Sequence, residues 1–139
     1  MYDLKSDALV DVCMKNVQSC TLCLSAFSKV FKAQSSGRCV DLLMSCSAIC
    51  RLNATFAGQQ NQYAKQLSIL CAQVCRACSA ECEQYGNRYF RYCAKTCLEC
   101  GQECERFVAK YDSGLLARFA YYTQQKMNRR HDTKLLEGS

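Results

Sequence analysis

Cysteine side chains dominate the chemistry that this sequence can support. Fourteen of the 139 residues are cysteines, and the thiolate is a soft ligand for metal ions. They form four groups along the chain: Cys13, Cys20 and Cys23; Cys39, Cys46 and Cys50; Cys71, Cys75, Cys78 and Cys82; Cys93, Cys97, Cys100 and Cys104. Neighbours within a group lie three, four or seven residues apart, which places them on one face of an α-helix. The spacing therefore predicts four helices, each with one stripe of thiols.

Four such stripes can face a common interior in a four-helix bundle. Short breaks rich in glycine or polar residues occur at Ser35-Ser36-Gly37, at residues 58–61 and at Gly86-Asn87. The expected helices span about residues 5–34, residues 37–58, the segment from residue 62 to about 85, and residues 88–111. Because short connections make neighbouring helices antiparallel, the sequence predicts an all-α, antiparallel up-down-up-down four-helix bundle with a cysteine-lined core.

The C-terminal region is expected to leave this bundle. Asp112-Ser113-Gly114 is typical of a helix stop, so the predicted four-helix bundle domain covers residues 1–112. Residues 113–139 are expected to form a short amphipathic C-terminal helix, with Leu115, Phe119 and Tyr122 on it, followed by a basic flexible tail. Two interpretations of that helix are open: a contact with another subunit, or a lid on the chain's own bundle.

The cysteines are expected to be reduced. Disulfide scaffolds are usually short and rich in turns, whereas this chain has no proline and six glycines. Side chains at positions i and i+4 have Cβ atoms about 5–6 Å apart, but a disulfide needs about 3.8 Å. Neither a signal-peptide pattern nor an apolar stretch long enough to span a membrane is apparent, so we expect a cytoplasmic protein. An exported mature form, with its targeting segment removed, is the alternative.

Metal binding explains why sulfur occupies positions where an ordinary core uses Leu, Ile or Val. Tetrathiolate zinc sites would each carry a net charge of about −2 in a dry interior, and zinc and iron–sulfur ligands usually come from loops. A cuprous ion accepts two or three thiolates and cancels the charge of one. Cu(I) therefore fits best, at about one ion per cysteine with sulfurs bridging between ions, while zinc and iron–sulfur clusters stay open alternatives.

Folding the helices at the expected turns ranks the thiols by depth. Five crowd the end of the bundle near Ser36 and Asn87: Cys39, Cys78, Cys82, Cys93 and Cys97. Four are expected midway (Cys46, Cys71, Cys75 and Cys100) and four deeper (Cys20, Cys23, Cys50 and Cys104). Cys13 is expected almost alone near the far end. We therefore expect copper to enter at the Ser36/Asn87 end and to move inward by ligand exchange. Met14 and Met44 are candidate accessory ligands at a mouth, although methionine more often fills gaps in a core.

The two repeats Cys71-x3-Cys75-x2-Cys78-x3-Cys82 and Cys93-x3-Cys97-x2-Cys100-x3-Cys104 resemble those of the bacterial four-helix-bundle copper storage proteins. The resemblance covers roughly residues 5–112. It implies storage of many Cu(I) ions on the fourteen core thiolates and assembly as a homotetramer. A copper chaperone or other acceptor protein is expected as the partner that takes up released ions. Histidine often accompanies the thiols near the mouth in that family, whereas the single histidine here is His131, close to the C-terminus.

The predicted function is thus copper storage without catalysis. The sequence has no nucleophile elbow, no paired carboxylates with a pocket signature and no glycine-rich phosphate loop. An iron–sulfur or redox electron carrier is the main alternative. The formal charge of +6 and the basic segment from Lys126 to Lys134 raise a third hypothesis, an interaction module for membranes or nucleic acid. No recognition motif supports that hypothesis, so neither nucleic acid nor membrane is expected as a partner.

Overall fold

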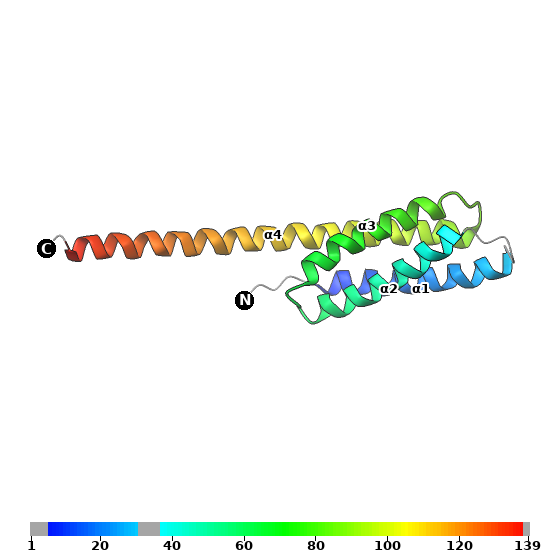
Figure 1. The fold of residues 1–139 in the computed structure, drawn as a ribbon, viewed down its shortest axis with the longest axis horizontal. Helices are drawn as coiled ribbons and strands as arrows, with labels where there is room; N and C mark the ends of the chain where they lie inside the picture. The colour runs from blue at the N-terminus through cyan, green and yellow to red at the C-terminus, as the bar shows by residue number, and fades with distance from the viewer. Residues whose placement is uncertain (1–5, 31–36, 138–139) are drawn as a thin grey trace.

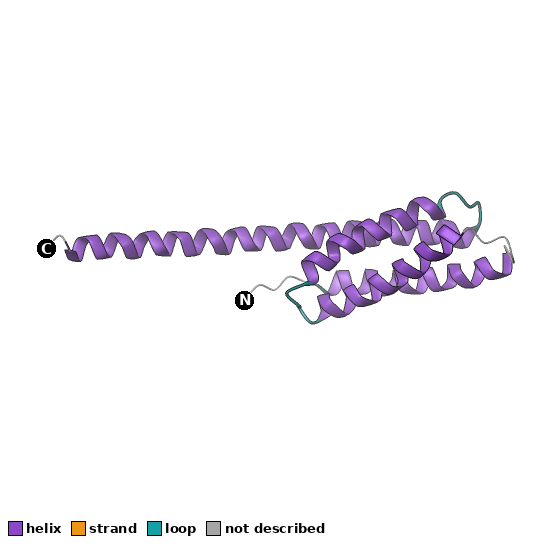
Figure 2. Ribbon diagram, in the orientation of Figure 1, coloured by secondary structure: helices purple, strands orange, loops and turns teal. Residues whose placement is uncertain are grey.

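A computed structural model describes residues 6–30 and 37–137, and this part of the chain forms four α-helices and no strand (Figures 1 and 2). The helices are α1 (Asp7–Val30), α2 (Gly37–Gly58), α3 (Ala64–Cys82) and α4 (Arg88–Glu137). They run alternately up and down, and α1 and α3 each pack against both α2 and α4. The predicted antiparallel four-helix bundle is confirmed.

The connections explain where the helices end. After Gly58, Gln60 has a φ of 51° and the backbone N–H of Asn61 donates to the carbonyl of Phe56 at 2.9 Å, which closes α2. Asn87 caps α4, because its side-chain oxygen accepts the backbone N–H of Tyr89 at 2.8 Å. The third helix ends at Cys82, three residues earlier than predicted. Residue 5, the expected end of the first helix at 31–34, and Ser35-Ser36 lie outside the described residues.

Each helix buries one stripe of residues at intervals of three and four, and all fourteen cysteines on these stripes are fully buried. Larger side chains occupy the ends of the interior. Phe27 and Phe90 close it near Asn87, whereas Leu9 and Phe107 lie at the opposite end. The sulfur-lined part of the core therefore lies between two apolar layers.

The expected break at Asp112-Ser113-Gly114 is wrong, because α4 continues without interruption to Glu137 (Figure 1). Asp112 does not cap a new helix; its carboxylate instead pairs with Lys65 of α3 at 2.6 Å. Glycine in a helix costs only about 1 kcal/mol relative to alanine, and no proline is present to break the chain of hydrogen bonds. Residues 113–137 thus form a straight continuation that projects past the bundle.

One helix of the described part, α2, is long and apolar enough by composition to cross a bilayer. The prediction that no segment meets this criterion is therefore wrong, since an 18-residue window of α2 has a mean hydropathy of 1.2. Helices in the interior of a bundle satisfy the same criterion. Here α2 packs against α1 and α3, and its inward face carries Cys39, Cys46 and Cys50.

Candidate metal centre

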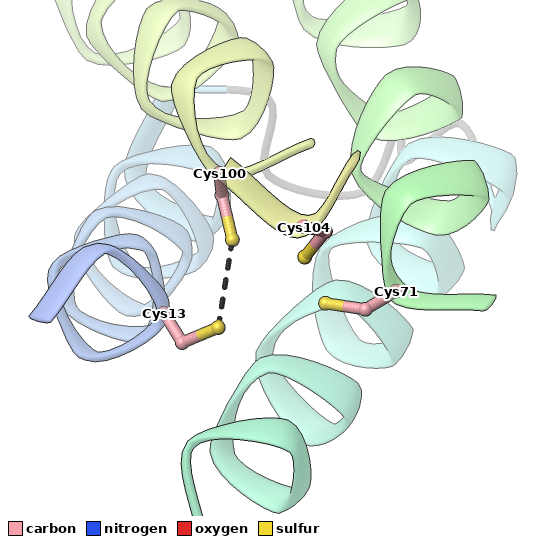
Figure 3. Close-up of side chains that lie close together, drawn as sticks. All are labelled: Cys13, Cys71, Cys100 and Cys104. Atoms are coloured by element: carbon pink, nitrogen blue, oxygen red, sulfur yellow. Dashed lines mark hydrogen bonds between the residues drawn. The ribbon is translucent and has the colours of Figure 1, made fainter. Parts of the chain in front are cut away.

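The buried thiols lie in four groups whose sulfur atoms are within 4.8 Å of one another. Each group draws on at least three helices, and Figure 3 shows the group that lies furthest from Asn87. The groups are Cys13, Cys71, Cys100 and Cys104; Cys50, Cys71, Cys75 and Cys100; Cys20, Cys46, Cys78 and Cys97; and Cys23, Cys82 and Cys93. Antiparallel packing thus converts four linear stripes into clusters of potential metal ligands.

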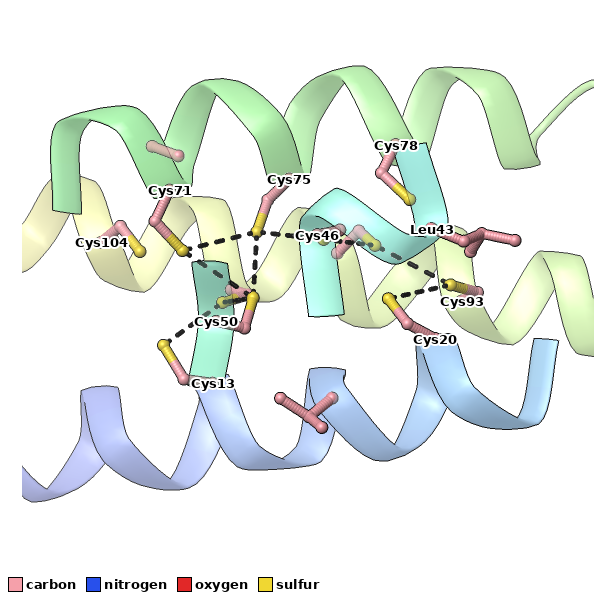
Figure 4. Close-up of a cluster of buried hydrophobic side chains, with 14 of the residues drawn as sticks. Cys13, Cys20, Leu43, Cys46, Cys50, Cys71, Cys75, Cys78, Cys93 and Cys104 are labelled. Carbon is pink, nitrogen blue, oxygen red and sulfur yellow. Dashed lines mark hydrogen bonds between the residues drawn. The ribbon is translucent and has the colours of Figure 1, made fainter. Parts of the chain in front are cut away.

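The groups are connected to each other. Cys71 and Cys100 each belong to two of them. The sulfur of Cys75 lies 3.6 Å from that of Cys50 and 3.7 Å from that of Cys46, which joins the middle groups (Figure 4). These separations are much longer than the roughly 2.05 Å of a disulfide, and all fourteen cysteines are free. The arrangement agrees with the predicted free thiols, and the sulfurs form one continuous column.

The thiols of α1 lie at a different depth from that predicted. Cys13 is not alone, since it joins Cys71, Cys100 and Cys104, and Cys23 lies at the Asn87 end with Cys82 and Cys93. Residues that face each other across an antiparallel helix pair lie equally far in sequence from the centre of the connection. Asn16 contacts Cys50 and Cys20 lies beside Cys46, and the midpoint of both pairs is residue 33. The prediction instead placed the centre of the turn at residue 36. This error displaces α1 by about six residues, or about 9 Å, relative to α2.

Two buried asparagines complete the column, and the sequence prediction missed both. The side-chain amide of Asn16 donates to the sulfurs of Cys46 at 3.3 Å and Cys50 at 3.5 Å, and its oxygen accepts the hydroxyl of Thr96 at 2.8 Å. The amide of Asn53 donates to Cys104 at 3.6 Å, and its oxygen accepts the hydroxyl of Ser68 at 3.2 Å. Their positions, three residues after Cys13 and three after Cys50, continue the thiol stripes and were the available signal.

Hydrogen bonds between thiols lower the pKa of some cysteines and raise the pKa of others. Each group contains a sulfur that accepts from its neighbours, and these bonds lower the pKa of Cys46 to about 2 and lower the pKa values of Cys50, Cys93 and Cys104 as well. Donation to Cys100 and burial together raise the pKa of Cys13. Nine thiols have a raised pKa: Cys13, Cys20, Cys23, Cys39, Cys71, Cys75, Cys78, Cys97 and Cys100. Most of the column is thus protonated at neutral pH.

The two ends of the column differ. At the Asn87 end Cys39 belongs to none of the four groups, and burial raises its pKa to about 12. The rings of Phe27, Tyr85 and Phe90 pack together over this end, with 4.7 Å between the centroids of Tyr85 and Phe90. The opposite end has no sulfur beyond the group that contains Cys13, and Asn53 and Leu9 follow. The Asn87 end therefore carries one thiol outside the four groups.

Met14 and Met44 lie outside the column. Their side chains are 41% and 58% exposed, respectively, whereas every thiol is fully buried. Both belong to outward positions of α1 and α2, next to the inward stripes. A role for these thioethers would therefore be at the outer surface.

Comparison with known proteins gives a consistent match over the bundle. A sequence model of the copper storage protein family, Csp, matches residues 3–109. The uncharacterized cysteine-rich protein YhjQ of Bacillus subtilis (strain 168) is 26% identical over 80 residues, which cover 58% of this chain and 74% of YhjQ.

Solved structures share the fold. The Cu(I)-bound copper storage protein BsCsp3 superimposes with a TM-score of 0.71 at 25% identity, over 74% of this chain and 97% of BsCsp3. Apo-Csp3 from Bacillus subtilis gives a TM-score of 0.69 at 27% identity, over 74% of this chain and 98% of its own. The Nmul_A1745 protein of Nitrosospira multiformis gives 0.70 at 23% identity, over 78% and 98%, which shows the fold alone.

Replacing the buried amide of Asn16 tests its contribution to the metal-free protein. Asn16→Ala removes the donor to Cys46 and Cys50 and leaves part of the Thr96 hydroxyl bonding unmet, so we expect a loss of about 1–3 kcal/mol in the free energy of unfolding. Urea denaturation of reduced apo protein measures it. The matched control is Asn128→Ala on the exposed part of α4, expected within about 0.5 kcal/mol of the parent. Equal stability of both variants would show that the amide contributes nothing.

Proposed function

The chain belongs to the copper storage protein family, and we propose that it stores Cu(I) on all fourteen core thiolates and releases the ions to an acceptor. The observation that carries this proposal is the continuous column of buried sulfurs, arranged in groups that could each hold metal. The family is one of storage proteins and not a class of enzymes. The Cu(I) state of BsCsp3 supports the same oxidation state for the cargo here.

Charge balance in the dry core sets the proposed capacity. A cuprous ion bound by thiolates offsets one negative charge, and each buried thiolate needs such a partner. Neutrality is reached at about one ion per cysteine, on the order of fourteen per chain. Since each ion needs at least two sulfurs, thiolates must bridge ions at that loading. Cys71 and Cys100 each belong to two groups, so their thiolates are placed to bridge ions in both.

The geometry disfavours the two alternative metal centres. Separate tetrathiolate zinc sites need ligands that belong to one site each, whereas the two groups furthest from Asn87 share Cys71 and Cys100. An iron–sulfur cluster contains inorganic sulfide between its ligands. The sulfurs of Cys46, Cys50 and Cys75 are already in contact at 3.6–3.7 Å, which leaves no room for sulfide without expansion of the bundle. Small cuprous ions that bridge neighbouring sulfurs require less displacement.

Anaerobic titration of the fully reduced protein with Cu(I), followed by metal analysis after gel filtration, tests the storage proposal. We expect uptake of about fourteen equivalents, because neutrality requires about one ion per thiolate. The product should be colourless. Saturation at one or two equivalents would contradict storage, and a brown protein that retains iron and sulfide on purification would support the electron-carrier alternative.

Proton release during copper binding tests the raised pKa values of the thiols. Because most thiols are protonated in the apo protein, each Cu(I) that binds them displaces about one proton. We expect fewer protons from the first equivalents, which can use Cys46, Cys50, Cys93 and Cys104, and about one per ion afterwards. Copper affinity should accordingly fall as the pH falls. A pH-stat measurement during titration checks this, and release that stays near zero throughout would show that the thiols are already ionised.

Copper is proposed to enter at the Asn87 end, where Cys39 stands beyond the four groups. Sulfurs continue inward from there through Cys82 and Cys93, so an ion can move by successive ligand exchange. An apolar layer covers each end of the column, so what distinguishes the Asn87 end is the additional thiol of Cys39.

Two triple variants distinguish the ends. Replacing Cys39, Cys82 and Cys93 with Ser should slow uptake from a Cu(I) chelator about tenfold or more, because the relay loses its outer ligands. The matched control replaces Cys13, Cys71 and Cys104, which removes the same number of thiols at the far end and should reduce capacity with little change in rate. Stopped-flow measurement of both rates checks the assignment. Slower uptake in the far-end variant alone would reverse it.

Three further expectations rest on the sequence and on family resemblance and stay predictions. They are a cytoplasmic location, assembly as a homotetramer, and transfer of copper to a chaperone.

A further inference from the structure

The thiol column consists of two sets of sulfurs, and none of the four groups of potential ligands contains members of both. The two groups that share Cys71 and Cys100 make up what we call the far set: Cys13, Cys50, Cys71, Cys75, Cys100 and Cys104. The other thiols, on the side of Asn87, make up the near set: Cys20, Cys23, Cys39, Cys46, Cys78, Cys82, Cys93 and Cys97. The far set thus offers six thiols and the near set eight.

The sulfurs are connected within each set, and the two sets meet at Cys46. In the near set, the sulfur of Cys93 lies 3.9 Å from those of Cys20 and Cys97, which joins the two groups. The sulfur of Cys46 lies 3.7 Å from that of Cys75 in the far set (Figure 4). An ion that crosses between the sets by ligand exchange can therefore pass from Cys46 to Cys75.

The side-chain amide of Asn16 lies at this boundary. Its nitrogen is 3.3 Å from the sulfur of Cys46, and it is 3.5 Å and 3.7 Å from the sulfurs of Cys50 and Cys75. The side chain is completely buried. One amide group thus contacts sulfurs of the near set and of the far set at the place where the sets meet.

Asn16 occupies a position where the stripe of α1 could carry a thiol. The residues Cys13, Asn16, Cys20 and Cys23 follow one another at intervals of three, four and three. The stripes of α3 and α4 each carry four thiols at intervals of four, three and four. At the level of Asn16, α2 and α3 supply sulfur to the interior, whereas α1 supplies an amide. The column therefore lacks one ligand at the boundary between the sets.

A further hydrogen bond fixes which end of the amide faces the sulfurs. The oxygen of Asn16 accepts the hydroxyl of Thr96 at 2.8 Å, so the N–H groups point toward Cys46 and Cys50. An amide N–H is a donor with no lone pair for a metal ion. It also engages the sulfur lone pairs that a cuprous ion needs. Copper must displace these hydrogen bonds to bind at the boundary.

We propose that Asn16 divides the copper store into two pools: a near pool on eight thiols that empties first, and a far pool on six thiols behind it. The inference rests on the proposed storage of Cu(I) and on the proposed passage of ions through the Asn87 end. An ion that leaves the far pool must displace an N–H of Asn16 from both Cys75 and Cys46. Ions within either set move between sulfurs that this amide does not separate. The near pool is thus readily available, and the far pool is a reserve.

Anaerobic removal of copper from the fully loaded protein by an excess of bathocuproine disulfonate, a Cu(I) chelator, tests the division. The absorbance of the chelator complex counts the ions released. We expect about eight ions in a first phase and about six in a second, because each thiol holds about one ion. The second phase should be about tenfold slower or more, since two hydrogen bonds oppose the crossing.

Two variants that each add one thiol show whether the position matters. Asn16→Cys places a sulfur at the boundary, so release should follow a single phase and capacity should rise by about one ion. Thr96 keeps a partner in this variant, because its hydroxyl also donates to the carbonyl of Cys93 at 3.1 Å. The matched control is Asn53→Cys, which adds its thiol beside Cys104 at the far end. It should gain about the same capacity and keep both phases.

A second pair of variants leaves the number of thiols unchanged. Asn16→Ala removes the N–H groups from Cys46 and Cys75, so the slow phase should become about three to ten times faster at constant capacity. Asn53→Ala removes the corresponding amide at the far end and should change the slow phase by less than about twofold. Far-UV circular dichroism of each apo variant checks that the bundle stays helical.

Capacity and release kinetics report on different proposals. A parent protein that takes up only one or two ions would contradict storage itself. Uptake of about fourteen ions followed by release in one phase would leave storage intact and overturn the division. Two unchanged phases in Asn16→Cys, a single phase in Asn53→Cys, or equal rates in the two alanine variants would also overturn it. Each of these results would mean that the boundary at Asn16 does not control the movement of copper.

Discussion

A thiolate buried away from water must have a cation or a hydrogen-bond donor beside it, and this constraint governs the interior of the protein. Without metal, sulfurs 3.6–3.9 Å apart satisfy one another. The amide of Asn16 donates to Cys46 and Cys50 in the middle of the column, and the amide of Asn53 donates to Cys104 at the end furthest from Asn87. The same short separations let one monovalent ion contact two or three sulfurs. The apo and loaded proteins can therefore share one backbone arrangement, and copper replaces the protons and hydrogen bonds that it displaces.

The constraint also divides the core into regions with different tasks. Cysteine is a small side chain, and a column of thiols buries less apolar surface than the Leu, Ile and Val of an ordinary bundle. Leu9 and Phe107 at one end and Phe27 and Phe90 at the other supply larger buried side chains. Ion pairs between helices, such as Arg76 with Glu105 at 2.7 Å, are exposed and contribute little. The large apolar side chains that stabilise the fold thus lie at the ends of the core, and the middle is occupied by the metal-binding thiols.

Spacing alone predicted the bundle and the burial of every cysteine, because intervals of three, four and seven leave one geometric solution when they recur on four segments. It could not fix the register of α1, since that depends on the connection at residues 31–36. Cys13 was consequently placed apart from its actual neighbours Cys71 and Cys100. Asn16 and Asn53 escaped notice because buried asparagine is identified by the partners it finds. The helix break predicted at Gly114 was wrong because, without proline, a single glycine weakens a helix and does not end it.

The thiol column and residues 113–137 share one helix but are physically separate. Cys104 is the last sulfur on α4, Phe107 closes the column one turn later, and residues 117–129 are exposed. Because the sulfurs already lie in contact, copper loading does not require α4 to rotate. The part of α4 that projects past the bundle therefore keeps its direction in the apo and the loaded protein.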